Sequence, residues 1–198
     1  MTSHPLRLVW SKPHEKARPY TNKRAFSHLY EQAHIAVYRY ALGLTGNAQD
    51  AEDVTADTFI KAWNARESFS GDEDAALGWL FTITKNLVID RSRKQDRRPQ
   101  NVVLDETLLQ ATQPLPEQQA ITEEQKRALW DLLNTLAEDR RDMLVLRYMV
   151  GWQVQRIAAH LNMNPNTVSA TISRTLKQLH AHLLLDSHEG GHDARTIS

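Results

Sequence analysis

Apolar residues recur every three to four positions along most of this 198-residue chain, and that spacing predicts α-helices. In the first half it predicts three helices, which cover about residues 25–45, 48–65 and 75–94. Gly46-Asn47 is a signal for the end of the first helix, and Pro99 stops the third. We therefore predict a unit of three helices in this part of the chain.

The second half predicts four further helices, most of them short. They are expected around Leu129–Leu136, Met143–Met149, Val154–Leu161 and Pro165–Leu183, and Gly151 separates the second from the third. No segment of useful length alternates with the period of two that a strand requires. The predicted fold class is all-α, with two small helical domains joined by a flexible linker.

Segments rich in proline or glutamine, and shifts in local charge, mark the predicted boundaries of the two helical domains. Residues 1–24 carry six Lys or Arg against one acid, whereas residues 101–122 carry three acids and no base. The predicted segments are a basic flexible arm 1–24, a first helical domain 25–98, a linker 99–122, a second helical domain 123–185 and a disordered tail 186–198.

The formal net charge is zero, but the charges are segregated. Acids outnumber bases by six to three in residues 25–70, and bases gather near the end of the third predicted helix. This segregation indicates two kinds of partner, one anionic and one not, with solvated helix faces as the alternative. Composition alone does not separate these two readings.

Three absences narrow the class of protein. The chain has no cysteine, which excludes a disulfide scaffold and a thiolate metal site. No apolar run approaches the ~20 residues that cross a bilayer, and residues 1–10 lack the features of a signal peptide. We expect a cytoplasmic protein without membrane insertion.

Residues 153–177 have the pattern of a helix-turn-helix. Ala158 supplies the small residue where two helices touch, and Asn162 is tolerant of the left-handed geometry that the turn needs. Asn164 is a good N-cap before Pro165. The last helix would expose short polar and basic groups to base edges in the major groove, and a plain helical hairpin is the alternative.

The second and third predicted helices differ in their chemistry. The second gathers acids in its first turns, with Phe59 and Trp63 further along; this suits a protein-docking face, and equally suits the positive end of a helix. The third mixes aromatic residues with a basic end, which suits DNA with unstacked bases.

Two runs of residues, together with the helix-turn-helix, resemble a known family. Residues 50–63 read Asp-Ala-Glu-Asp-Val-Thr-Ala-Asp-Thr-Phe-Ile-Lys-Ala-Trp, similar to the polymerase-docking helix of sigma-70 factors. Residues 78–93 read Gly-Trp-Leu-Phe-Thr-Ile-Thr-Lys-Asn-Leu-Val-Ile-Asp-Arg-Ser-Arg, similar to the promoter-melting and −10-reading helix. The order and size resemble the extracytoplasmic-function (ECF) group, which keeps only domains 2 and 4.

The resemblance implies a bacterial sigma factor that binds RNA polymerase core and directs promoter-specific initiation at −10 and −35 elements. It implies no catalytic residue, no cofactor and no metal. The implied partners are promoter DNA, the clamp coiled coil of the largest polymerase subunit and the flap of the second-largest. It leaves open whether an anti-sigma factor also binds.

The resemblance also assigns residues to each partner. The residues implied at the polymerase core are Asp50, Glu52, Asp53, Thr58, Phe59 and Trp63. Those implied at the −10 element are Ser70, Gly71, Asp72, Lys85, Asn86, Asp90, Arg91, Arg93 and Lys94. Those implied at the −35 element are Asn164, Asn166, Thr167, Ser169, Ala170, Ser173, Arg174 and Lys177.

Two other functions compete with this one. A one-component helix-turn-helix regulator would explain residues 123–185 but leaves the two quoted runs unexplained. A carboxylate-bridged metal enzyme would use the spacing of Glu31 and His34, but it needs a second such pair, which the sequence lacks.

Overall fold

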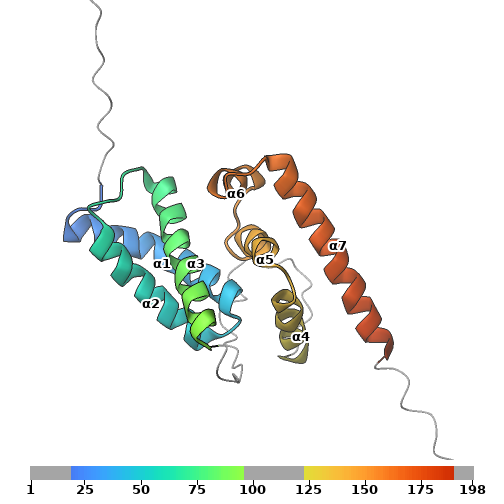
Figure 1. Ribbon diagram of the computed structural model, residues 1–198. Coiled ribbons are helices and arrows are strands. Elements are labelled where there is room, and N and C mark those ends of the chain that lie inside the picture. The colour runs from blue at the N-terminus through green and yellow to red at the C-terminus, as the bar shows by residue number, and fades with distance from the viewer. Residues whose placement is uncertain (1–18, 96–122, 190–198) are drawn as a thin grey trace, which may run out of the picture.

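The computed structural model describes residues 19–95 and 123–189, and the statements below concern those residues. Their regular secondary structure is entirely helical, and the helices are arranged as two groups that lie side by side (Figure 1). This confirms the all-α fold class. The predicted linker, most of the predicted arm and residues 190–198 of the predicted tail lie outside the described residues.

The first group contains three long helices: α1 (Lys23–Thr45), α2 (Ala48–Ala65) and α3 (Glu73–Gln95). Asn47 caps α2, because its side chain accepts a hydrogen bond of 3.0 Å from the backbone N–H of Asp50. Gly46 ends α1 with φ of 67°, a conformation that costs glycine little. The predicted break at Gly46-Asn47 is therefore confirmed with its mechanism.

The start of this group differs from the predicted arm. Residues 19–22 form a turn, and α1 begins at Lys23, within the segment predicted to be flexible. Tyr20 is buried, with its ring centroid 5.9 Å from that of Phe69. Burial of this aromatic side chain holds residues 19–24 to the first domain, a contact that local sequence does not reveal.

The second group contains α4 (Glu123–Asn134), α5 (Glu138–Leu144), a π-helical turn η2 (Val145–Met149), α6 (Val154–His160) and α7 (Pro165–Glu189). The helix predicted around Met143–Met149 begins five residues earlier, and its second half is π-helical. In addition, α7 continues to Glu189, past residue 186 where the tail was predicted to begin.

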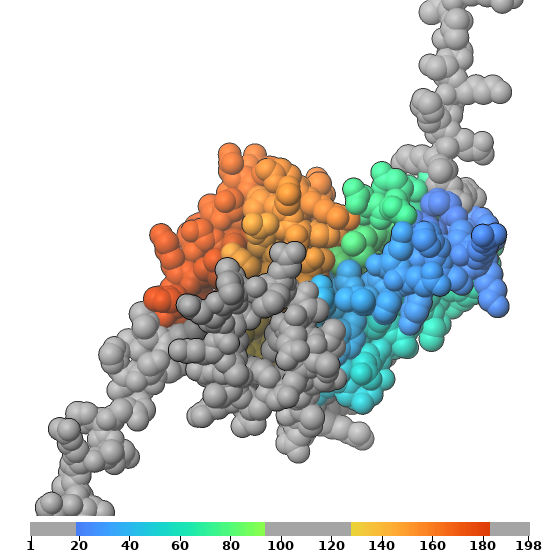
Figure 2. Space-filling model, turned by 180° about the vertical axis from the view of Figure 1, so that it is seen from behind, coloured from blue at the N-terminus to red at the C-terminus, as the bar shows by residue number. Residues whose placement is uncertain are grey.

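The two groups share one hydrophobic core, which includes Tyr40 and Phe81 from the first group and Leu146 and Trp152 from the second. The Phe81 and Trp152 ring centroids are 5.0 Å apart. Figure 2 shows the surfaces of the two groups meeting directly, the second in orange and the first in blue to green. This contact brings α3 and the helix-turn-helix into the same body.

Candidate nucleic-acid and polymerase interfaces

The helix-turn-helix consists of α6, a tight turn and α7. Asn162 has φ of 52° and is the only non-glycine residue with positive φ in the described part of the chain. The turn closes through a 2.8 Å hydrogen bond from the Met163 backbone N–H to the Ala158 carbonyl. Asn164 then starts α7, because its side chain accepts from the Asn166 N–H at 2.9 Å.

Buried apolar residues fix the angle between these two helices. Ile157 and Ala158 of α6 and Val168 and Ile172 of α7 are all buried. The residues predicted to face DNA are all exposed: Asn164, Asn166, Thr167, Ser169, Ala170, Ser173, Arg174 and Lys177. The structure therefore leaves this face of α7 open to solvent.

The loop before α3 is built on stacked rings. The centroids of Phe69 and Trp79 are 4.8 Å apart, and the rings are nearly parallel. Beside them, the buried hydroxyl of Ser70 has no hydrogen-bond partner among the described residues. Asp72 caps α3, since its side chain accepts from the Ala75 N–H at 2.8 Å. Its carboxylate thus has a structural role of its own.

Along α3, the predicted −10 residues differ in how accessible they are. Asn86, Asp90 and Arg93 are exposed, whereas Lys85 is half-buried. The Lys85 ammonium donates to Asp142 of α5 at 2.7 Å. Lys94 lies in α3, but its side chain is outside the described residues.

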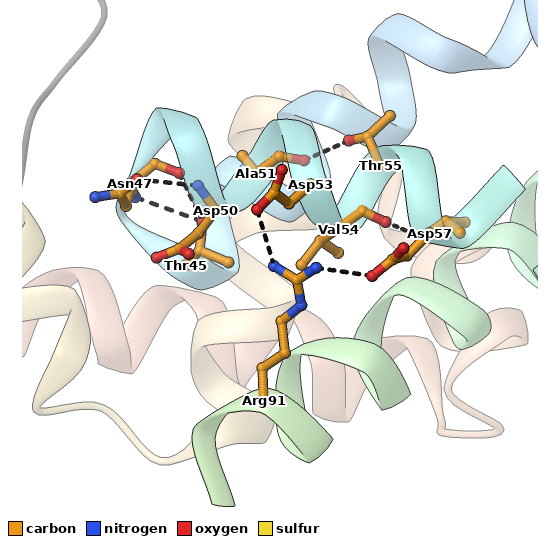
Figure 3. Close-up of polar contacts among 10 residues, drawn as sticks. Thr45, Asn47, Asp50, Ala51, Asp53, Val54, Thr55, Asp57 and Arg91 are labelled. Atoms are coloured by element: carbon orange, nitrogen blue, oxygen red, sulfur yellow. Dashed lines mark hydrogen bonds and ion pairs between the residues drawn. The ribbon is translucent and has the colours of Figure 1, made fainter. Parts of the chain in front are cut away.

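Arg91 is held by the acids of α2 (Figure 3). Its guanidinium lies 2.7 Å from the carboxylate of Asp57 and 3.7 Å from that of Asp53. The acidic edge predicted to dock polymerase is thus partly neutralised from within the domain. The Arg91 side chain retains 29% of its exposure, so it is tied to α2 at the surface and not in the core.

The predicted docking residues fall into two groups. Glu52 and Asp53 are exposed and Asp50 is half-buried, so these acids form an edge of α2 that a partner can reach. Thr58 and Phe59 are buried instead. The Thr58 hydroxyl lies 3.1 Å from that of Thr84 in α3, which shows that it holds two helices together.

Trp63 is intermediate between these groups. Its ring meets Phe26 edge-on, with a centroid distance of 5.1 Å, and the Arg66 guanidinium lies 3.9 Å above it. Most of its surface is therefore already used inside the domain.

Sequence reasoning missed the polar contact between the two groups. Asp142 is buried and accepts hydrogen bonds from the Tyr40 hydroxyl and the Lys85 ammonium, each at 2.7 Å. Burial, together with the charge and hydrogen bond of Asp142, raises the pKa of Tyr40 well above its usual value. The signal in the sequence is small: one acid directly before the apolar run Met143–Leu146.

Opposing effects act on the two bases beside Asp142. Burial lowers the pKa of Lys85, but the hydrogen bond and charge of Asp142 outweigh it, and the pKa is raised overall. Burial lowers the pKa of His160, assisted by the charges of Lys85 and Arg156 and opposed by that of Asp142. At neutral pH, Lys85 is a cation and His160 is an uncharged ring.

The last candidate site from the sequence is the pair Glu31 and His34. The His34 ring stacks on Tyr30, with centroids 5.2 Å apart. Within residues 19–95 and 123–189, no group of three or more His, Cys, Asp or Glu is placed to hold a metal ion. None of the described helices combines the length and the apolar character needed to span a membrane.

Comparison with known proteins decides between the competing functions. The family model of sigma-70 region 2 matches residues 29–98, and that of sigma-70 region 4 matches residues 126–179. The ECF RNA polymerase sigma factor SigL of Mycobacterium tuberculosis is 31% identical over 156 residues, which cover 76% of this chain and 84% of the relative. This chain belongs to the sigma-70 family, in its ECF group. It is a sigma factor that directs transcription initiation, and the regulator hypothesis is not favoured.

Other relatives agree with this identification. SigX of Bacillus subtilis is 26% identical, covering 82% of this chain and 86% of the relative. Among solved structures, RpoE of Bartonella quintana in complex with the anti-sigma factor NepR has a TM-score of 0.60 at 25% identity, covering 82% of this chain and 99% of that one. CnrH in complex with the cytosolic domain of CnrY has a TM-score of 0.59 at 26% identity, covering 86% and 93%. The groups α1–α3 and α4–α7 correspond to sigma domains 2 and 4.

Proposed function

We propose that this sigma factor divides its contacts among three surfaces. The acidic edge of α2 docks on the clamp coiled coil of the polymerase core. The loop before α3 and the exposed face of α3 read and melt the −10 element. The exposed face of α7 reads the −35 element.

Exposure and charge support the docking surface. Glu52 and Asp53 project from α2, and next to them the exposed side chains of Tyr30 and Ile35 on α1 line a shallow groove with Glu52. An acidic edge beside apolar anchors is the composition expected of a protein-docking face. Thr58 and Phe59 support this surface from beneath, because both are buried.

The docking proposal predicts a charge-dependent loss of core affinity. Glu52→Lys should weaken binding of the full chain to purified core by about tenfold, since it reverses a charge at the centre of the surface. Glu67→Lys, at an exposed site beyond the end of α2, is the matched control and should bind normally. Equal affinities for both variants would contradict the assignment of this surface.

A loop with an unused polar group supports the −10 proposal. The Ser70 hydroxyl lacks a partner among the described residues, although it lies beside the Phe69–Trp79 stack. A base edge that enters this loop would supply the missing hydrogen-bond partner, because a hydroxyl can both donate and accept. Asn86 and Arg93 then present an amide and a cation along α3 for bases and phosphates.

One observation carries the −35 proposal: a tight helix-turn-helix leaves every predicted DNA-facing residue of α7 exposed. Asn166 and Thr167 stand in the first turn, where a recognition helix meets base edges. Arg174 and Lys177 stand further along, where they would bind phosphate. We therefore assign base preference to Asn166 and Thr167, and general affinity to Arg174 and Lys177.

Transcription from a promoter library with a randomised −35 element tests this division. Asn166→Ala should cost about 1–3 kcal/mol on the preferred sequence and little on others. Arg174→Ala should weaken all sequences nearly equally. If Arg174→Ala changes the selected sequence and Asn166→Ala does not, the two roles are reversed.

Further partners follow from the relatives. RpoE was solved in complex with the anti-sigma factor NepR, so we propose that an anti-sigma factor also binds this chain. We place the action of this sigma factor in the bacterial cytoplasm, where RNA polymerase transcribes. The groove between α4 and α7, lined by Leu132, Leu136 and Leu179, is the surface that we assign to the polymerase flap.

A further inference from the structure

The contact between domains 2 and 4 uses Lys85, a residue that the family resemblance assigns to the −10 element. Lys85 lies on the −10 face of α3, and its ammonium is bound to Asp142 of domain 4. Asn86 lines the same cavity between the domains as Asp142 and His160. Part of the −10 face is therefore turned toward domain 4 in this structure.

Asp142 is the centre of this contact. Its side chain is 1% exposed, and each carboxylate oxygen accepts one hydrogen bond from domain 2: Oδ1 from Tyr40 and Oδ2 from Lys85. A buried carboxylate is stabilised only when such partners are present. If the domains separated, Asp142 would lose both partners, and Lys85 would become free to bind another anion.

Near Asp142, helix α1 and the π-helical turn η2 pack so closely that one added side-chain atom would disturb their contact. Gly43 of α1 faces η2, and a Cβ atom there would lie 2.7 Å from Val145 Cγ2, 2.8 Å from Met149 Sδ and closer still to Val145 Cγ1. A β-branched side chain such as Val145 has no rotamer that withdraws both methyl groups. Glycine at position 43 is thus required for contact between domains, although α1 itself does not require it.

The closed body is too small to read both promoter elements at once. A compact chain of 198 residues has a radius of gyration of about 16 Å. Elements at −10 and −35 are about 25 base pairs apart, or about 85 Å along the duplex at 3.4 Å per pair. The chain between Gln95 and Glu123 could span about 90 Å when extended, so its length permits the domains to separate.

We propose that the free sigma factor closes on itself through a latch formed by Tyr40, Lys85 and Asp142, and that promoter DNA competes with Asp142 for Lys85. The competition part of this proposal rests on the proposed −10 role of α3. A buried ion pair balances a gain in attraction against a loss of hydration. The latch therefore fixes how the two domains meet, while the shared apolar core beside it supplies most of the stability of the closed form. A DNA phosphate can replace the carboxylate at Lys85 because both are anions.

Distance measurement in the full chain tests the closed form without polymerase. The chain has no cysteine, so Ser27→Cys and His180→Cys place one fluorescent label on the exposed surface of each domain. Wild type should show high energy transfer. Gly43→Ala should shift the population to low transfer, while domain 2 keeps its stability because alanine favours a helix over glycine.

Two charge variants on α5 test the latch itself. Asp142→Asn offers one acceptor where two donors converge, so the ratio of closed to open molecules should fall by about tenfold or more. Asp139→Asn is the matched control, because that carboxylate is 85% exposed and 3.8 Å from the same ammonium. It should leave the ratio nearly unchanged. Low transfer in wild type, or no response to Gly43→Ala and Asp142→Asn, would overturn the latch.

Chemical acetylation of Lys85 separates the latch from the DNA role. In the free wild-type chain Lys85 should react slowly, and in Gly43→Ala it should react at least several times faster. When Gly43→Ala holoenzyme is bound to a premelted promoter DNA, Lys85 should again react slowly with the acetylating reagent. If protection does not return, the −10 role of Lys85 is wrong while the distance result stands; if free wild type reacts as fast as Gly43→Ala, the latch is wrong.

Discussion

Arg91 offers a direct test of how the surface charges of domain 2 are used. From the sequence it resembles a DNA contact of α3, but in the structure its guanidinium is bound to Asp57 at 2.7 Å and lies near Asp53 (Figure 3). We predict that Arg91→Gln lowers the stability of domain 2 and leaves the salt dependence of DNA binding unchanged. Arg93→Gln should instead leave the stability of domain 2 unchanged and reduce the salt dependence of DNA binding, because Arg93 is exposed on the same helix.

The expected magnitude follows from the exposure of the charges. The Arg91 side chain is 29% exposed, and the carboxylates of Asp57 and Asp53 are 45% and 55% exposed. Water screens such a pair, so its loss should cost about 0.5–1 kcal/mol. For a domain of this size, that loss corresponds to a fall in Tm of roughly 2–8 °C. A lost phosphate contact would instead lower the salt slope by about 0.7–0.9.

Two measurements decide the outcome. Thermal unfolding of the full chain reports the stability of each variant, and holoenzyme binding to promoter DNA against salt concentration reports the slope. Asp57→Asn should lose about as much stability as Arg91→Gln, and the double variant should lose less than the sum. If Arg91→Gln lowers the slope as much as Arg93→Gln does and unfolds like wild type, our assignment of Arg91 to the α2 acids is wrong.

Three further predictions concern single residues. Thr58→Val should cost about 0.5–1 kcal/mol and leave core affinity intact in a direct titration, because the buried hydroxyl contacts Thr84 and not a partner. Asn162→Ala should destabilise domain 4 by about 1 kcal/mol in urea unfolding, whereas Asn162→Gly should not, since φ is 52°. Burial lowers the pKa of His160 in the folded chain, whereas a histidine of the unfolded chain has a pKa of about 6.5. As the pH falls, the unfolded chain is therefore protonated at this position before the folded chain is. Stability should therefore fall as pH drops from about 7.5 to 5.5, and His160→Gln should lack that part of the fall; identical pH profiles would refute it.

The helices and the helix-turn-helix were predictable because their signals are local. Asn47 and Asn164 act on backbone groups two or three residues away, and Gly46 and Asn162 need only their own backbone freedom. Apolar spacing likewise identifies the inner face of each helix. The exposed face of α7 could therefore be predicted residue by residue.

Tertiary packing decided how the polar residues of domain 2 are used. Thr58 and Asp57 lie close together in sequence on the same helix, yet one is buried against Thr84 and the other binds Arg91 at the surface. Which of these faces inward depends on the position of α3, and a motif alone does not contain that information. The π-helical turn η2 and the burial of Tyr20 likewise depend on tertiary packing and not on a local motif.

The contact between the domains is furthest from what sequence determines. Asp142 is separated by 57 residues from Lys85 and by 102 from Tyr40. Helix signals depend on residues within about four positions, so the sequence indicated α1 and α3 separately and the α5–η2 segment only in part. Their meeting depends on shape, above all on the missing side chain at Gly43 that lets η2 approach α1. Only close packing in three dimensions could place a carboxylate between a tyrosine and a lysine from another domain.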